Sequence, residues 1–419
     1  MTDSIHRVID AVWRIESARL IAGLARIVRD VGIAEELAQD ALVTALQQWP
    51  ESGIPRNPGA WLMATAKHRA IDVLRRNKRF ESKRAELTLE LESRHESRIG
   101  NDMGDDMGED LLGLVFTACH PVLSREARAA LTLRVVGGLT TEEIARAFIV
   151  PEPTIAQRIV RAKRTLAEKK VPFEVPGGDE LTARLSSVLE VIYLIFNEGY
   201  SATAGDDWMR PSLCDDALRL GRMLAELTPR EPEVHGLVAL MEIQASRAHA
   251  RVDRSGQPIL LLDQNRALWD QLLIRRGLAA LQRAAKLARA RGPYVLQAAI
   301  AACHARARTA GETDWARIAT LYGELARLVP SPVIDLNRAV AIGMAVGPQA
   351  GLDLVDALAS DDYLRTYHLL PSVRGDLLAK LGRAEEAAAE FERAALMTRN
   401  TRERTLLLGR AALCKKPLQ

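Results

Sequence analysis

Hydrophobic residues recur every three or four positions along most of the chain, which is the period of an α-helix. One apolar stripe runs from Val8 to Ile27, and a second runs from Ala34 to Leu46. The pair Trp49 and Pro50 is expected to end the second helix. Long alternating runs rich in valine, isoleucine and threonine are missing from the sequence. The pattern therefore predicts an all-α protein.

Residues 139–166 predict two helices joined by a short turn. Thr140 is a good N-cap, and Glu143 follows three residues later, as a capping box requires. Pro151 ends the first helix, because proline excludes the α conformation from the residue before it. Pro153 suits the first turn of the second helix, where its missing N–H costs nothing. This spacing is typical of a helix-turn-helix.

The second of these helices has two unlike faces. The stripe that is expected to pack on the first helix consists of Ile155, Ile159, Ala162 and Leu166. The predicted DNA-binding set on the remaining surface consists of Thr154, Gln157, Arg158, Arg161 and Arg164. Such a helix fits the major groove, where its arginines meet phosphates or guanine. The alternative is a surface helix with solvated arginines. The coincidence of cap, turn and amphipathic helix favours DNA binding.

A second basic helix is predicted over residues 59–79, after a loop that contains Pro55 and Pro58. Its candidate DNA-binding residues combine one aromatic side chain with cations and a histidine: Trp61, Lys67, His68, Arg69, Arg75 and Arg76. A basic helix with an exposed aromatic side chain can bind and stack single-stranded bases. From composition alone, a solvated helix end with a structural tryptophan is the favoured interpretation.

The second half of the chain adds a long helical extension over residues 180–419. Its last part repeats helical hairpins around three turn glycines, Gly311, Gly347 and Gly382, at a spacing close to the tetratricopeptide length. Stacked hairpins of this kind form a concave surface, which predicts a protein or peptide partner. Residues 83–110 are acidic and lack an apolar period, which predicts a flexible linker. This linker is interpreted either as a mimic of nucleic acid in a basic channel or as a solvating spacer.

Composition narrows the function further. A length of 419 residues suggests two to four domains, and the net charge of +3 does not by itself indicate nucleic acid. The four cysteines are far apart and lack metal-ligand spacing: Cys119, Cys214, Cys303 and Cys414. No P-loop, nucleophile–base set or metal motif is found, so neither enzyme activity nor a cofactor is predicted. A signal peptide and an apolar run of about 18 residues are also missing, which predicts a cytoplasmic protein with no membrane partner.

Residues 139–166 also resemble the C-terminal DNA-binding region of bacterial sigma factors, in the extracytoplasmic-function group of the sigma-70 family. The matching positions are Leu139, Thr140, Glu143, Ile144, Ala145, Pro151, Thr154, Ile155, Arg161, Ala162, Lys163 and Leu166. Two other motifs of that family precede them in the same order, at residues 34–42 and 61–76. His68 departs from the pattern, since the family usually has asparagine there. The resemblance covers about residues 5–170.

The resemblance implies roles for these motifs. It implies that the acidic helix carrying Glu36, Gln39 and Asp40 docks on bacterial RNA polymerase core. The basic helix would engage and help melt the downstream (minus ten) promoter element, and the helix-turn-helix would read the upstream (minus thirty-five) element. The expected domains are a region 2-like domain (1–82), the linker (83–110), a region 4-like domain (111–172) and the tetratricopeptide-like extension (180–419).

Two phrases in the extension resemble those of a sigma-factor subgroup with a fused C-terminal tetratricopeptide-like domain. They contain Asn197, Glu198, Asp335 and Arg338, which we expect to form a polar network between the extension and the sigma domains. Two other functions stay open from the sequence. One is a stand-alone helix-turn-helix regulator with a helical sensory domain, and the other is a scaffold whose sigma-like part is vestigial.

Overall fold

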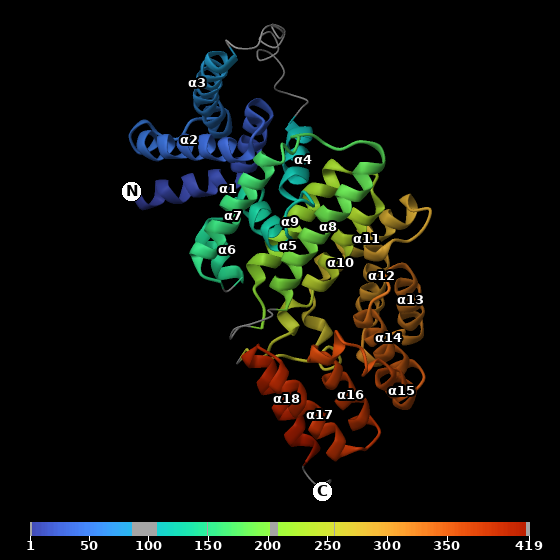
Figure 1. Ribbon diagram of the computed structural model, residues 1–419. Helices are drawn as coiled ribbons and strands as arrows, with labels where there is room; N and C mark the ends of the chain where they lie inside the picture. The colour runs from blue at the N-terminus through green and yellow to red at the C-terminus, as the bar shows by residue number, and fades with distance from the viewer. Residues whose placement is uncertain (1, 86–106, 149, 202–207, 255, 416–419) are drawn as a thin grey trace. The chain divides into compact units, whose positions relative to one another are not determined.

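The computed structural model describes residues 2–85, 107–148, 150–201, 208–254 and 256–415 (Figure 1). Within these ranges the regular elements are all helices, apart from one isolated β-bridge between Val252 and Pro258. The all-α prediction is therefore confirmed. Among the described helices, none combines the length and the apolar character that a membrane span requires. The chain divides into two compact units, residues 1–192 and residues 193–419.

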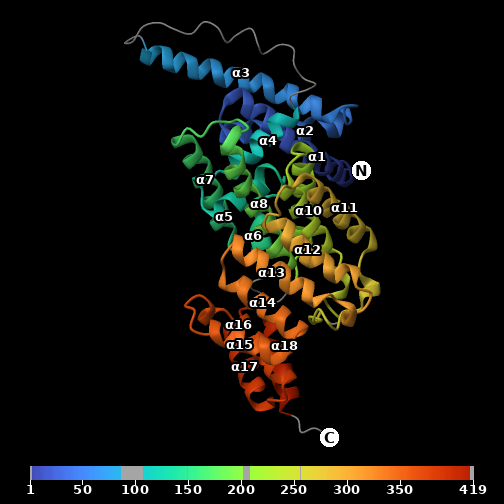
Figure 2. The ribbon, with the colours of Figure 1, turned by 90° about the vertical axis from the view of Figure 1, so that its right-hand side faces the viewer.

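The described residues of the first unit form seven helices and the beginning of an eighth. They are α1 (Thr2–Val28), α2 (Val31–Ser52), α3 (Pro58–Ala85), α4 (Met107–Ala118), α5 (Arg125–Val135), α6 (Thr141–Phe148), α7 (Glu152–Glu168) and α8 (Gly178–Tyr200). Helices α1, α2 and α3 pack on one another, and α5, α6 and α7 form a second group. Figure 2 shows that α3 extends well past the ends of α1 and α2.

Helix α2 begins and ends for identifiable reasons. Asp30 is its N-cap, and the carboxylate accepts a hydrogen bond of 2.9 Å from the amide of Ile33. Pro50 lies inside the last turn, so the expectation that Trp49 and Pro50 end the helix was wrong. A proline this close to the end removes only one backbone hydrogen bond, and the helix continues to Ser52.

Helix α4 begins at Met107, within the stretch that the sequence analysis assigned to the acidic linker. Asp110 is buried in its first turn, where a carboxylate is favoured by the helix dipole, and lies 3.4 Å from Arg26 of α1. The residues 86–106 of the predicted linker lie outside the described residues. The first part of α8 is held against this domain, because Arg184 donates to the carbonyl of Phe116 at 3.0 Å.

The second unit consists of the end of α8 and a series of packed helical hairpins. Its further helices are α9 (Pro211–Leu227), α10 (Pro232–Ala245), α11 (Gln271–Leu287), α12 (Pro293–Arg306), α13 (Trp315–Leu328), α14 (Pro332–Ala345), α15 (Pro348–Leu358), α16 (Leu369–Lys380), α17 (Ala384–Met397) and α18 (Thr401–Cys414). Short 3-10 turns occur at η2 (Ala248–Ala250), η3 (Arg266–Leu268), η4 (Ala310–Glu312) and η5 (Leu364–Thr366).

The three turn glycines of the predicted repeat lie between consecutive helices of this unit. Gly311 is in the turn between α12 and α13, Gly347 joins α14 to α15, and Gly382 joins α16 to α17. Gly382 has φ +77°, a conformation that side-chain-bearing residues rarely adopt. Helices α14 and α15 approach so closely that a Cβ on Gly351 would lie only 2.8 Å from the Cα of Gly343. Glycine is thus required both for a turn and for close packing.

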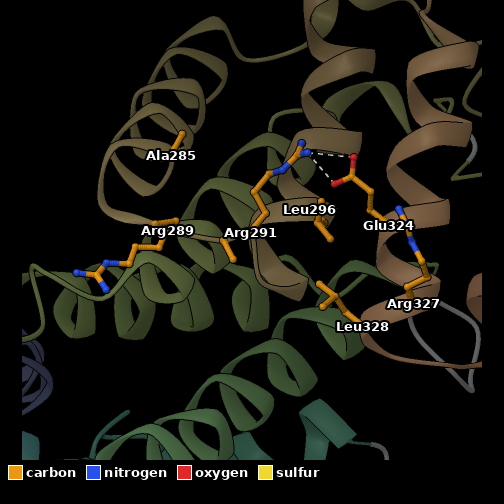
Figure 3. A pocket seen from close by; sticks show the side chains of 9 residues that line it. Ala285, Arg289, Arg291, Leu296, Glu324, Arg327 and Leu328 are labelled. Atoms are coloured by element: carbon orange, nitrogen blue, oxygen red, sulfur yellow. Dashed lines mark hydrogen bonds and ion pairs between the residues drawn. The ribbon is translucent and has the colours of Figure 1, made fainter.

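A pocket of about 510 Å³ lies where the end of α11 meets α12 and α13 (Figure 3). Leu296 and Leu328 form part of its apolar lining. Arg291 is paired with Glu324 across it, with nitrogen–oxygen distances of 2.7 and 3.0 Å. Arg289 and Arg327 also line it, and both are exposed.

Candidate nucleic-acid interface

The cap between α5 and α6 has the geometry that the sequence analysis predicted. The amide of Glu143 donates to the hydroxyl of Thr140 at 3.1 Å, and the amide of Thr140 donates to the Glu143 carboxylate at 2.8 Å. These reciprocal bonds satisfy two backbone donors that a helix start would otherwise leave without partners. They fix the position at which the chain turns into the helix-turn-helix.

Removing this cap is expected to destabilise the helix-turn-helix. Thr140→Ala should lower the free energy of unfolding by about 1 kcal/mol, because the amide of Glu143 loses its acceptor. Chemical denaturation of the full chain measures the loss. Glu142→Ala is the matched control, since its ion pair with Arg146 is exposed and is worth at most about 0.5 kcal/mol. Equal losses in both variants would contradict the proposed role of the cap.

Helix α7 places its apolar stripe inward. All four residues of the predicted stripe are buried: Ile155, Ile159, Ala162 and Leu166. Gln157, Arg161 and Arg164 are exposed, whereas Thr154 and Arg158 are half-buried. Arg164 is held along the helix surface by a 2.7 Å ion pair with Glu168. The structure therefore presents the predicted DNA-binding set on one surface helix, with Gln157 and Arg161 most accessible.

Arg158 lies close enough to α5 to affect its first turn. The pKa of Glu126 is held below its usual range chiefly by the backbone amide at the start of α5 and by the hydroxyl of Ser124. The positive charge of Arg158 also lowers the pKa of Glu126. The charge of Arg158 thus interacts with Glu126 in the unbound protein, whereas no described ion pair holds Arg161.

The predicted downstream set on α3 is only partly exposed. Trp61 is half-buried, with its ring 5.3 Å from that of the buried Trp49 in an edge-on contact. It is therefore not the freely exposed aromatic residue that the composition suggested. His68 and Arg75 are exposed, and Lys67 is half-buried. The side chain of Arg76 lies outside the described residues.

Arg69 connects this set to the predicted polymerase-binding set. Its guanidinium lies 2.9 Å from the carboxylate of Asp40 and donates to the hydroxyl of Thr44 at 3.2 Å. Glu36 and Asp40 are exposed on α2, and Gln39 is half-buried. The structure thus brings Asp40 and Arg69, which were assigned to different partners, into one ion pair on the surface.

A carboxylate that was not predicted as functional links the two groups of helices in the first unit. Glu35 of α2 is only 2% exposed, and its carboxylate accepts a 2.6 Å hydrogen bond from Nε of Arg134 on α5. Gln39 donates at 2.6 Å to the same carboxylate oxygen as Arg134, and Lys163 of α7 forms an ion pair with the other oxygen. We call Glu35, Arg134 and Lys163 the Glu35 network. The one available sequence signal is a carboxylate that falls on the apolar stripe of α2.

The four residues of the expected interdomain network are not brought together among the described residues. Glu198 pairs with Arg210 of the same unit, and both side chains are largely buried. Asn197 is hydrogen-bonded to Tyr193. Asp335 and Arg338 lie on α14, several helices further along the array. Glu198 therefore has a partner within its own unit and close to it in the sequence. Within the described residues, no group of three or more His, Cys, Asp or Glu is arranged to hold a metal ion.

Three family models match separate parts of the chain. Residues 15–80 match sigma-70 region 2, and residues 114–166 match sigma-70 region 4. Residues 184–285 match a family of unknown function, DUF6596. The chain is also similar to "Uncharacterized protein R00370" of Rhizobium meliloti (strain 1021), with 43% identity over 384 residues, or 91% of this chain and 90% of the relative. No solved structure matches the chain.

Proposed function

This chain belongs to the same family as the Rhizobium meliloti protein and carries sigma-70 regions 2 and 4, and we propose that it is an RNA polymerase sigma factor of the extracytoplasmic-function group. The observation that carries this proposal is the occurrence of both regions in order, with a capped helix-turn-helix in the second. Such a protein is a non-enzymatic initiation factor that works with core polymerase in the cytoplasm. The full chain is expected to co-elute with purified core polymerase in gel filtration, and its elution as a free protein would contradict the proposal.

Helix α7 is the proposed reader of the upstream promoter element. Its exposed side chains Gln157 and Arg161 occupy the surface opposite the buried stripe, as major-groove readout requires. The first turn of α7 carries Pro153, which has no N–H, and the positive end of the helix dipole at this turn favours a phosphate. The capping box and the packing on α5 hold this helix in a fixed orientation.

Arg161→Ala is expected to weaken binding to promoter DNA by about 1–3 kcal/mol if Arg161 contacts a base edge in two places. Fluorescence anisotropy with promoter duplexes and scrambled duplexes measures the effect. Arg317→Ala on α13, in the second unit, is the matched control and should leave the affinity unchanged. An equal loss on all duplexes would make Arg161 a phosphate contact and would contradict base readout.

Helices α2 and α3 are the proposed polymerase-binding and promoter-melting elements. Asp40 and Glu36 offer exposed carboxylates on α2, and His68, Arg69 and Arg75 offer polar and positive groups on α3. Because the Asp40–Arg69 pair is exposed, it costs little to separate its two members when each meets its own partner. Trp61 can stack on a base only if it moves from its contact with Trp49.

The proposed function requires that the first unit open. The two promoter elements are about 25 base pairs apart, which is about 85 Å of duplex. The Glu35 network instead holds α7 in direct contact with α2. The two domains cannot occupy both elements in this arrangement, so the network must break when promoter and polymerase bind. We therefore assign the described conformation to the free protein.

The tetratricopeptide-like hairpins of the second unit are the proposed site of regulation. Stacked hairpins offer a concave surface for a protein or peptide partner. The support for this part of the proposal is the series of consecutive hairpins from α12 to α17 around Gly311, Gly347 and Gly382. A partner bound there would change the activity of the sigma domains to which the extension is covalently joined.

A further inference from the structure

Three arginines of the second unit lie around two aromatic rings, and all three are within residues 184–285. Arg251 stacks on Tyr200, with 3.5 Å between the guanidinium carbon and the ring centre, and Arg247 lies 5.6 Å from the same ring. Arg247 and Arg266 lie 5.7 and 5.1 Å from the ring centre of Trp269. We call Arg247, Arg251 and Arg266 the arginine cluster. Two aromatic rings thus hold three guanidinium groups close together.

The partners of these arginines are electrically neutral. Nη1 of Arg266 donates to the carbonyl of His304 at 2.7 Å, and its Nη2 donates to the hydroxyl of Thr313 at 2.9 Å. Nη1 of Arg251 donates to the carbonyl of Tyr200 at 2.6 Å. Nη2 of Arg247 donates to the Tyr200 hydroxyl and to the side chain of Gln244.

No ion pair joins the arginine cluster to an aspartate or glutamate in the part of the chain that the structure describes. Other arginines of the same unit do have such partners. Arg210 is paired with Glu198, and Arg222 lies 2.8 Å from the buried Glu242. The unit therefore supplies carboxylates to neighbouring arginines. The carboxylate of Glu312 acts on Arg266 only from beyond ion-pair distance, so within the described residues the cluster keeps an excess of positive charge.

The positive charge of the arginine cluster is largely buried. Arg251 is 6% exposed and Arg266 is 9% exposed. A buried charge is costly unless it has a counter-charge, and like charges nearby add to the cost. Burial and then the charge of Arg247 lower the pKa of Arg251. Burial, followed by the positive charges of Arg247 and Arg266, also lowers the pKa of the neighbouring His304 to about 4. This imidazole is therefore neutral at pH 7.

We propose that the arginine cluster binds the oxyanion of a small molecule, a phosphate or a carboxylate. Arg247 and Arg251 each commit one terminal nitrogen to described acceptors, so their other N–H groups can hold an oxyanion in a forked geometry. Nη1 and Nη2 of Arg266 donate to neutral acceptors, and its buried Nε has no described hydrogen-bond partner, so Arg266 contributes mainly its charge. Arg247 is half-buried and is therefore the most accessible of the three arginines. This site is independent of the proposed sigma activity.

Calorimetry and thermal unfolding of the full chain test this site with inorganic phosphate and citrate, each against sodium chloride of equal ionic strength. Wild type should bind phosphate or citrate and show a raised unfolding midpoint; the more effective anion identifies the ligand class. Arg251→Gln should weaken binding at least tenfold and should raise the midpoint of the ligand-free protein, because an uncompensated charge is removed. Arg283→Gln, an exposed arginine of α11, is the matched control and should change neither.

A purely structural cluster gives the opposite results. In that case neither anion would change the midpoint more than sodium chloride does, and Arg251→Gln would lower the midpoint of the ligand-free protein. If Arg251→Gln does not fold, Arg247→Gln takes its place, since Arg247 is half-buried and easier to replace. Unchanged anion affinity in a folded Arg247→Gln protein would overturn the proposal.

Discussion

Reversing the charge of Asp40 is expected to abolish binding to core RNA polymerase. Asp40 is an exposed carboxylate on α2, the helix that we propose docks on core polymerase. A lysine there would place like charge against a surface that receives a carboxylate, which costs several kcal/mol, or more than about a hundredfold in affinity. Gel filtration or anisotropy with core polymerase and the Asp40→Lys chain measures the loss.

The fold should survive this change. The ion pair that Asp40 makes with Arg69 is exposed, so its loss should lower the free energy of unfolding by less than about 1 kcal/mol. Glu51→Lys is the matched control, because Glu51 is an exposed acid at the end of the same helix. A folded Asp40→Lys chain that binds core polymerase as well as the Glu51→Lys chain would show that α2 is not the docking surface.

Removing the charge of Glu35 is expected to separate α5 and α7 from α2. Breaking a fully buried ion pair costs about 3–5 kcal/mol. The side chains of Arg134 and Lys163 are 22% and 21% exposed. We therefore expect Glu35→Gln to lower the free energy of unfolding by a smaller amount, about 2 kcal/mol. Chemical denaturation measures the change, and hydrogen exchange locates it.

The location of the change is as informative as its size. Faster exchange should appear in α2 and α5, whereas α6 should stay protected by the Thr140–Glu143 capping box. Glu36→Gln is the matched control, because Glu36 is the neighbouring exposed acid on α2. If Glu35→Gln and Glu36→Gln change stability equally, the Glu35 network does not hold the closed arrangement.

Local chemistry in the sequence predicted the helix-turn-helix well. The Thr140–Glu143 capping box depends on residues three positions apart, and the buried stripe of α7 depends only on helical spacing. The proline positions set the end of α6 and the start of α7 for equally local reasons. Features of this kind are readable from sequence because neighbours along the chain provide both partners.

Long-range contacts could not be predicted in the same way. Glu35 looks like one more acid in an acidic helix, and its partners Arg134 and Lys163 are about a hundred residues away or more. Trp61 is half-buried because Trp49 reaches it from another helix. Glu198 was expected to join Asp335 and Arg338 in a polar network, but Arg210, which is twelve residues away, pairs with it. In each case the tertiary structure, and not helical periodicity, selects the partner.

Run-off transcription with purified core polymerase tests the central claim most directly. The full chain is mixed with core polymerase and genomic promoter fragments, and transcripts are compared with those from core polymerase alone. A sigma factor should direct initiation from defined start sites, and Arg161→Ala should weaken it. A full chain that binds promoter duplex without polymerase, but neither binds core polymerase nor yields a specific transcript, would contradict the claim and favour a stand-alone helix-turn-helix regulator.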